Sequence, residues 1–154
     1  MSYARQDCPP APGPKHPIIR IKSPQDQRMT ILGSHIEGYW THWTGDRSVL
    51  CLQNGAACPK DRHNLPRRWK GYLHVIDHFN GRLGFLELTP AAAQHLRDAL
   101  EDCSFYRGMR FYISRTAGGK MGRLVIRMTT PCQQMQELPP AEPVLETLKR
   151  VFGE

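Results

Sequence analysis

The stretch KGYLHVIDHFNGRLGFLELTPAAAQHL, residues 70–96, contains the strongest local folding signals in this chain of 154 residues. Two runs rich in apolar and β-branched residues, 70–77 and 82–88, are separated by a short segment that contains Asn80-Gly81. Asn-Gly between two such runs is the strongest short sequence signal for a β-hairpin. The stretch therefore predicts two antiparallel strands joined by a tight turn.

A helix is predicted directly after this hairpin. Thr89 and Pro90 provide an N-cap residue and a first-turn proline, a combination that is typical of helix starts. In the sequence AAAQHLRDALEDC that follows, Leu96 and Leu100 are four residues apart and therefore lie on one helix face. We expect about three helical turns within 91–103.

Strand-like sequence lies on both sides of this region. Residues 29–43, MTILGSHIEGYWTHW, are rich in β-branched and aromatic side chains and are interrupted by Gly33 and Gly38. This pattern predicts one long strand that bends at its glycines. Further along the chain, residues 108–115 and 123–129 alternate apolar and polar side chains on either side of a glycine-containing turn, which predicts a second hairpin.

The two ends of the chain differ in composition from its middle. Residues 1–24 contain six prolines, so we expect a flexible, basic, proline-rich tail, with a short strand at 18–22. A folded domain is expected over 25–132. Residues 133–154 are expected to form a linker and a C-terminal amphipathic helix, because apolar residues recur at helical spacing after a pair of prolines.

The predicted elements follow the order strand, loop, strand, strand, helix, strand, strand. Five strands with a helix between the third and the fourth are typical of the OB-fold, a small barrel that binds oligonucleotides and oligosaccharides. We therefore predict a mainly β fold with two helices: a five-stranded OB-like barrel with a zinc knuckle inserted between strands 1 and 2. A general α+β sheet with one helix is the alternative.

The loop predicted over 42–66 contains cysteine and histidine residues at spacings that suit a metal site. Thiolate and imidazole groups are the ligands that Zn²⁺ prefers, and a site with four protein ligands is more often structural than catalytic. Two further residues, His35 and Asp61, are reserve ligands, and the alternative is that the cysteines are buried apolar residues and the histidines lie at the surface. The candidate ligands of a structural Zn²⁺ are His42, Cys51, Cys58 and His63.

Charge and strand patterning favour an anionic partner. Lysine and arginine outnumber aspartate and glutamate by 21 to 14, a net charge of +7 that favours nucleic acid before membrane. Because side chains alternate between the faces of a strand, each strand of the second hairpin has an apolar face and a face with arginine, to which the first strand adds Tyr112. Cations beside aromatic rings suit single-stranded nucleic acid, in which phosphates and exposed bases alternate. The candidate binding residues are Arg67, Arg68, Trp69, Lys70, Tyr72, His74, Arg107, Arg110, Tyr112, Arg115, Lys120, Arg123 and Arg127.

The chain resembles the phage-type single-stranded DNA-binding proteins, in which a zinc subdomain is inserted in an OB-fold. The resemblance rests on HWTGDRSVLCLQNGAACPKDRH, RRWKGYLHV and the helix entry LELTPAAAQHL, and it covers residues 30–130. Such proteins often hold the metal with one histidine and three cysteines; here Asp61 stands where the third cysteine would fall, and His63 lies two residues further on. Their acidic C-terminal tail, which recruits partners, has no counterpart in LETLKRVFGE, so we do not expect that role.

We therefore expect a non-catalytic single-stranded DNA-binding protein of DNA replication or recombination, cytoplasmic and associated with a nucleoid, a phage or a mobile element. No segment has the roughly 18–20 apolar residues that span a bilayer, and the first residues lack the apolar core of a secretory signal. Two alternatives remain open. One is a protein-interaction module that partners a replication, recombination or mobile-element machinery, and the other is RNA binding through the same surface.

Enzyme motifs are not present in the sequence. HVIDHFNGR resembles the first half of an HNH nuclease, but that motif needs a later asparagine and histidine on a helix. The chain has no asparagine after Asn80, and its only later histidine is His95. Nucleotide-binding glycine loops and the GxSxG motif of acyl-transfer enzymes do not occur either.

Overall fold

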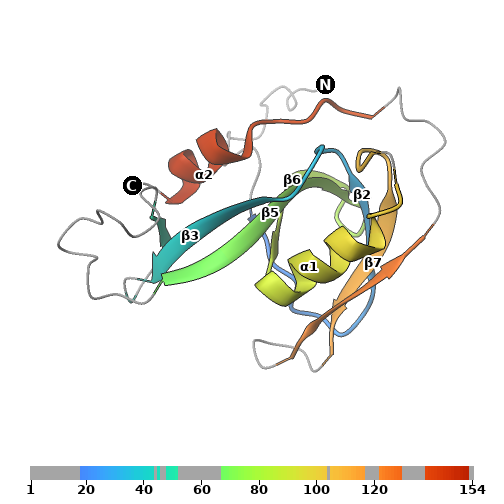
Figure 1. The fold of residues 1–154 in the computed structure, drawn as a ribbon, viewed down its shortest axis with the longest axis horizontal. Coiled ribbons are helices and arrows are strands. Elements are labelled where there is room, and N and C mark those ends of the chain that lie inside the picture. Colours follow the sequence, from blue (N-terminus) through green and yellow to red (C-terminus); the bar gives the residue numbers. More distant parts are fainter. Residues whose placement is uncertain are drawn as a thin grey trace, which may run out of the picture.

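The computed structural model of the protein describes residues 18–43, 45, 48–51, 67–103, 105–116, 122–129 and 138–152. This part of the chain forms one mixed, open sheet of eight strands with two helices (Figure 1), which confirms the predicted mainly β fold. The elements are β1 (Ile18–Ile19), β2 (Gln27–Ile31), β3 (Glu37–Trp43), β4 (Ser48–Leu50), β5 (Arg67–Asp77), β6 (Arg82–Leu88), α1 (Pro90–Ala99), β7 (Arg110–Arg115), β8 (Leu124–Met128) and α2 (Val144–Phe152).

The long strand β5 organises the sheet. Its second half pairs with β6 on one side, from Gly71 to Asp77, and with β2 on the other. Its first half pairs with β3, and β3 also pairs with the short strand β4. We call β3, β4 and residues 67–72 of β5 the wing, because this ribbon extends away from the other strands (Figure 1).

The strand predicted over 29–43 is divided into β2 and β3. The backbone N–H groups of Leu32 and Gly33 both donate to the carbonyl oxygen of His74, at 2.8 and 3.2 Å. Two residues that face one residue of the partner strand form a bulge, which bends the chain. The predicted bend at Gly33 is confirmed, whereas Gly38 lies inside β3 and pairs with Gly71.

The predicted count of five strands is wrong, because the structure has eight strands in its described part. Beyond the five strands of the predicted barrel, the structure has β4, the second part of the divided strand, and β1, which lies within the short strand predicted over 18–22. The sheet order is β1-β6-β5-β2-β7-β8, with β1 parallel to β6, and this open order does not show a closed barrel. Strand β4 lies inside the loop that the sequence assigned to metal binding over 42–66.

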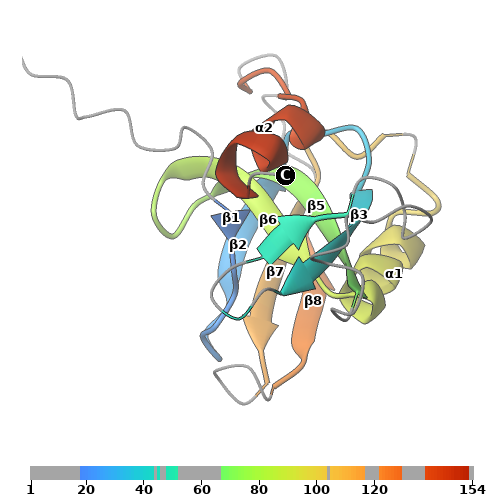
Figure 2. The ribbon, with the colours of Figure 1, turned by 90° about the vertical axis from the view of Figure 1, so that its left-hand side faces the viewer.

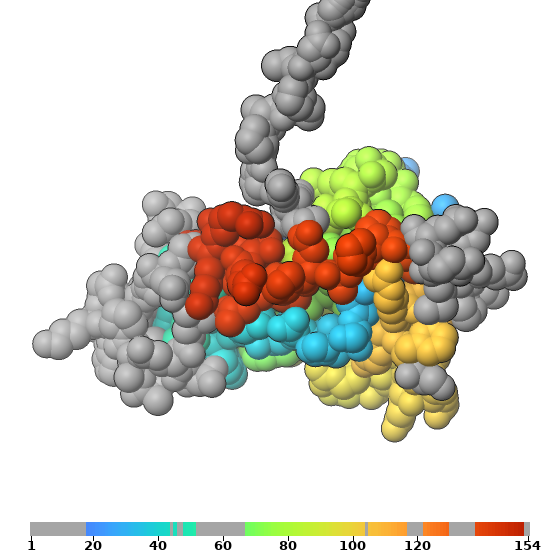
Figure 3. All heavy atoms as spheres, turned by 90° about the horizontal axis from the view of Figure 1, so that it is seen from above, coloured from blue at the N-terminus to red at the C-terminus, as the bar shows by residue number. Residues whose placement is uncertain are grey.

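Two hydrophobic clusters lie on opposite faces of the sheet. The larger is formed by apolar side chains of β2, β5, β6, β7, β8 and α1, with Phe111 and Leu73 fully buried. The smaller lies between α2 and the other face, where Leu148 and Phe152 pack with Leu50, Tyr72 and Phe85. Figure 2 shows α1 and α2 on different sides of the sheet, and Figure 3 shows α2 with residues 138–143 lying across one side of the molecule.

The ends of the predicted elements shift by a few residues. Ile19 and Ile21 are buried in the larger cluster, so residues 18–21 belong to the folded body rather than to the tail predicted over 1–24. Helix α1 begins at Pro90 with Thr89 as N-cap, as predicted, but it ends at Ala99. Neither helix in the described residues is long and apolar enough to cross a membrane.

Trp69 joins the wing to the larger cluster. Its indole lies over the facing glycines Gly38 and Gly71, and it also packs against the buried side chains of the larger cluster. A Cβ atom on Gly38 would overlap the Trp69 ring, and one on Gly71 would lie 3.0 Å from it. The two glycines therefore leave the space that the ring occupies.

Replacement of Gly38 by alanine is expected to lower the free energy of unfolding by about 1–3 kcal/mol, because the indole must leave its place on the ribbon. Chemical denaturation of Gly38→Ala measures the change. Gly33→Ala is the control, since its Cβ would meet nothing closer than 3.6 Å, and we expect no loss of stability there. If Gly38→Ala is as destabilising in a Trp69→Ala background as in the wild type, the overlap is not the cause.

Candidate nucleic-acid interface

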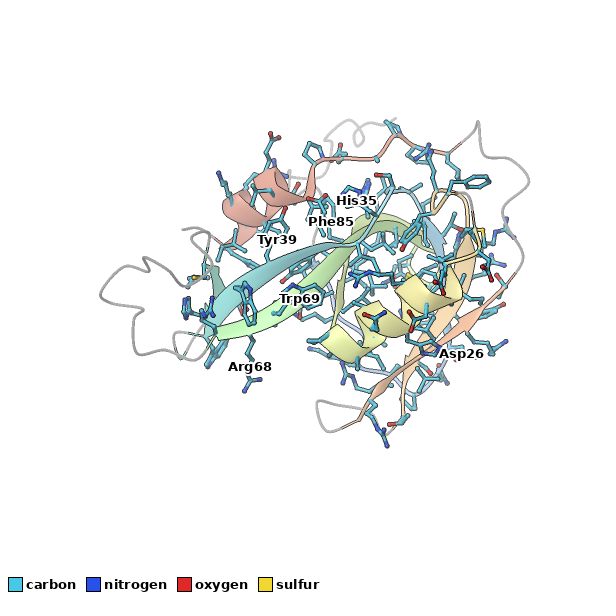
Figure 4. All side chains as sticks on the ribbon, in the orientation of Figure 1. Asp26, His35, Tyr39, Arg68, Trp69 and Phe85 are labelled. Atoms are coloured by element: carbon cyan, nitrogen blue, oxygen red, sulfur yellow. The ribbon has the colours of Figure 1, made fainter. Side chains whose placement is uncertain are left out.

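A groove of about 740 Å³ lies where the first residues of β5 diverge from the end of β6. Strand β6 pairs with β5 only as far as Gly71, and the chain then turns into α1 at Thr89 and Pro90. The space between these segments is the groove, and Figure 4 shows Trp69 between β5 and α1 on this side. The described residues that line it are Arg20, Ile21, Lys22, Trp40, Arg67, Arg68, Trp69, Lys70, Glu87, Leu88, Thr89, Pro90, Arg115 and Leu124.

Two tryptophans and an arginine form a ladder along one wall of the groove. Trp40 of β3 lies directly opposite Trp69 of β5, so both indoles are on the same face of the ribbon. The guanidinium of Arg67 lies 4.5 Å from the centre of the Trp40 ring. This contact is a cation–π interaction, which orients the cation beside an aromatic surface.

Glu87 is the single carboxylate among the described residues of the groove. Its Oε1 accepts from Nε of Arg20 at 3.2 Å and lies 3.4 Å from Nζ of Lys70. Its Oε2 accepts from the Tyr72 hydroxyl at 2.9 Å. Glu87 thus holds two cations at the groove, while six of the described lining residues are cationic.

Tyr72 and His74 do not form the base-stacking platform that the sequence predicted. Tyr72 is fully buried, and its ring packs against Phe152 of α2. His74 is 1% exposed, stacks on Phe85 at 4.8 Å, and accepts the backbone N–H of Glu142. Tyr72 thus lies under α2, and His74 contacts the segment just before that helix, both of which the sequence placed in a separate C-terminal segment.

The environment of Tyr72 strongly favours its neutral form. Burial raises the pKa of the Tyr72 hydroxyl far above its ordinary value, and the carboxylate of Glu87 adds to this shift. The pKa of Tyr39 is also raised, by burial first and then by its hydrogen bond to Glu37. Both tyrosines are hydrogen-bond donors of the wing, Tyr72 fully buried and Tyr39 partly buried.

The predicted arginine face of the second hairpin exists, but it lies on a different surface. Tyr112 and Arg127 are directly opposite each other on β7 and β8, and the Arg127 guanidinium lies 4.7 Å from the centre of the Tyr112 ring. Arg127 also forms an ion pair with Asp26 at 2.6 Å. On this outer face, the ring of Tyr112 and the guanidinium of Arg127 thus contact each other. Arg110 lies beside them, opposite Thr30 of β2.

The pKa of His78 is affected by the positive charge of this outer face. Its ring Nε2 lies 2.7 Å from the hydroxyl of Thr30. Burial lowers the pKa of His78, and the neighbouring guanidinium groups of Arg28 and Arg110 lower it further. A second basic surface therefore accompanies the groove.

The remaining predicted cations have mixed roles. The Arg107 guanidinium donates to the carbonyl oxygens of Leu32 and Leu138. It thus links the backbone at these two positions by hydrogen bonds. Arg115 lines the groove but also donates to carbonyl oxygens, those of Ile21 and Gly122. Arg123 is exposed at the start of β8, and Lys120 lies outside the described residues.

Two of the four predicted metal ligands lie in the described residues. His42 and Cys51 are buried, and the pairing of Cys51 with Trp40 places both side chains on one face of the wing. Cys58, His63 and the reserve ligand Asp61 lie outside the described residues, whereas His35 is exposed and close to Glu37. Within the described part of the chain, no group of three or more potential ligands is present.

Sequence reasoning missed Arg20, Lys22 and Glu87 as site residues. In the run 18–22 the isoleucines at 19 and 21 are buried while Arg20 and Lys22 are exposed, and this alternation is visible in the sequence. Glu87 could not be found in this way, because its role depends on the approach of β1 and β5 to β6.

Comparisons with models of known families, with curated proteins and with solved structures found no match to the chain. The functional interpretation therefore depends on the geometry and chemistry of the groove.

The alkaline stability of the protein is expected to depend on Tyr72. An unfolded tyrosine loses its proton near pH ~10, whereas the folded state keeps it, so stability is fully present below this pH and is lost as the pH rises. Tyr72→Phe removes this contribution, and its stability should fall more slowly above pH ~10, by about 1.4 kcal/mol per pH unit.

Denaturation of the wild type and of Tyr72→Phe at several pH values between neutral and alkaline measures both slopes. Near neutral pH the variant should be less stable by about 1–3 kcal/mol, because the partly buried carboxylate of Glu87 loses a donor. Parallel decline of the two proteins at alkaline pH would show that Tyr72 ionises normally when folded.

Proposed function

We propose that the chain is a non-catalytic protein that binds single-stranded DNA, and that the groove beside the wing is its main contact surface. The observation that carries this proposal is the presence of Trp40, Trp69 and six cationic residues in one groove of about 740 Å³. Exposed bases stack on aromatic rings with about 1–3 kcal/mol per base, and arginine and lysine side chains follow the phosphates. The groove supplies both kinds of contact side by side.

The position of the groove supports the same proposal. If β2 and β3 are counted as one bent strand, then β5, β6, α1, β7 and β8 follow in the order of an OB-fold with its helix between the third and fourth strands. OB-folds bind oligonucleotides on the face of strands 2 and 3 and with the loops after strands 1 and 4. The groove is lined by β5 and β6 and by Arg115 and Leu124, which flank the turn between β7 and β8.

We further propose that a structural Zn²⁺ is held by His42 and Cys51 together with Cys58 and His63. Two buried donors of the types that zinc prefers lie on one face of the wing, which supports the assignment. The ion would fix the segment between β4 and β5 and so stabilise the ribbon beside the groove. It would take no part in a reaction.

Binding to a single-stranded oligothymidylate should be tight at low salt and should weaken as salt is added. Trp40→Ala is expected to weaken binding about 10-fold, because one stacking surface is lost. Arg68→Ala should lower the slope of log K against log salt by about 0.7, since one phosphate contact is lost. Fluorescence anisotropy at several salt concentrations measures both effects.

Two variants locate the site. Arg97→Ala removes an exposed cation in the last turn of α1, at the end of the helix away from the groove, and should leave binding unchanged. Tyr112→Ala with Arg127→Ala disrupts the outer face of β7 and β8. If this double variant abolishes binding while Trp40→Ala does not change it, the outer face is the site and the groove is not. A matched RNA oligomer as competitor separates DNA from RNA binding.

The purified chain is expected to contain about one Zn²⁺, measured by elemental analysis. Cys51→Ala should lose the metal and unfold at a lower temperature, because the site loses a thiolate ligand. Cys103→Ala is the matched control, since Cys103 packs against the larger cluster, and it should keep its zinc. Metal-free wild-type protein with unchanged stability would overturn the zinc proposal and leave the DNA proposal intact.

A further inference from the structure

A second, smaller cavity of about 350 Å³ lies at the outer end of the wing. The described residues that line it are Thr41, Trp43, Ser48, Arg68 and Lys70. Trp43 is 54% exposed, which is unusual for so large an apolar side chain. Neither the core nor the groove uses this tryptophan.

The strand register places this cavity on the other face of the wing from the ladder of Trp40 and Trp69. Trp43 lies opposite Ser48, and Thr41 lies opposite both Leu50 and Arg68. Directly opposed residues of antiparallel strands point to the same face, and successive residues alternate. Trp43 therefore belongs to the face of Thr41 and Arg68, while Trp40 and Trp69 belong to the opposite face.

Arg68 and Lys70 connect the two cavities, because both residues line both of them. Residues 67–70 of β5 pair with β3 on one side, and within the described residues no strand pairs with their other side. The ribbon thus has an open edge here, and Arg68 extends beyond β5 on the side away from β3 (Figure 4). Two cations line the passage from one face to the other.

We propose that a bound single strand continues from the groove around this edge of β5, and that one further base stacks on Trp43. The inference rests on the proposed function of the groove. Arg68 and Lys70 would contact the phosphates at the turn, and Thr41 and Ser48 line the same cavity as the ring that receives the base. Among the described lining residues of the small cavity there are two cations and no carboxylate, which favours a phosphodiester chain over a peptide.

This path makes the contribution of Trp43 dependent on the length of the ligand. A short oligomer that fills only the groove does not reach the far face, whereas a longer one does. The contribution of Trp40 has no such dependence, because its ring lies in the groove itself. Affinity measured over a series of lengths therefore separates the two tryptophans.

The experiment compares Trp43→Ala with the wild type on fluorescently labelled oligothymidylates of increasing length. We expect unchanged affinity for the shortest oligomers that bind and a loss of about 10-fold for the long ones, typical of one stacked base. Trp43→Phe keeps an aromatic face and should restore most of the loss. Phe79→Ala is the matched control, because Phe79 is 69% exposed in the turn at the other end of β5.

Intrinsic fluorescence gives a second readout, because the chain has three tryptophans. In the double variant Trp40→Phe, Trp69→Phe only Trp43 emits, and long oligomers should quench this emission while short ones should not. Thermal unfolding of each variant shows whether the wing is intact. A folded double variant that still binds long oligomers by anisotropy, but whose emission they leave unchanged, would overturn the inference.

The outcomes separate this inference from the proposed function. If Trp40→Ala weakens binding and Trp43→Ala has no effect at any length, the groove binds DNA and the path around the edge is wrong. If Trp43→Ala weakens short and long oligomers equally, Trp43 acts within the groove or on the wing, and the second subsite is again overturned. If neither the wild type nor any variant binds single strands, the proposed function itself fails.

Discussion

The packing of Trp69 on two facing glycines is the contact on which the candidate site depends. A two-stranded ribbon has little core of its own and is marginally stable when isolated. Trp69 stabilises the ribbon on one face, because its ring lies over Gly38 and Gly71 and packs against the larger hydrophobic cluster. Helix α2 stabilises the other face of the ribbon by packing against Leu50 and Tyr72. The wing is therefore held at a fixed position beside α1 and β6, and the groove is the space between them.

The charges of the groove would suit the anionic ligand that we propose for it. Glu87 reduces the excess of positive charge, but it also restrains Arg20 and Lys70, and its other oxygen is fixed by Tyr72. Cations held in place before binding lose less conformational freedom when a phosphate arrives. On the outer face, Arg127 pairs with Asp26 and lies over the ring of Tyr112, just as Arg67 in the groove lies over the ring of Trp40. The groove differs in having six cationic residues and one carboxylate among its described lining residues.

The sequence predicted the parts of the fold that depend on local signals. The hairpin at Asn80-Gly81, the helix start at Thr89 and the alternation in β7 and β8 all follow from neighbouring residues, and the structure confirms them.

What the sequence could not show is which distant segments meet. Tyr72 and His74 alternate with apolar residues like exposed side chains, yet α2 covers Tyr72 and the segment just before α2 contacts His74, some 70 positions later in the chain. The split of the candidate cations into a groove and an outer face likewise depends on how β5 bends between β2 and β3.

The dependence of the wing on α2 also has a kinetic consequence. The face made by Leu50, Tyr72 and Phe85 stays uncovered until α2, formed by residues 144–152, has docked. Contacts between segments so distant along the chain close late, because a large loop must be ordered first. During synthesis the sheet can begin to pair while this apolar surface is still open to other chains. The docking of α2 thus decides when the ribbon, and with it the groove, becomes a finished structure.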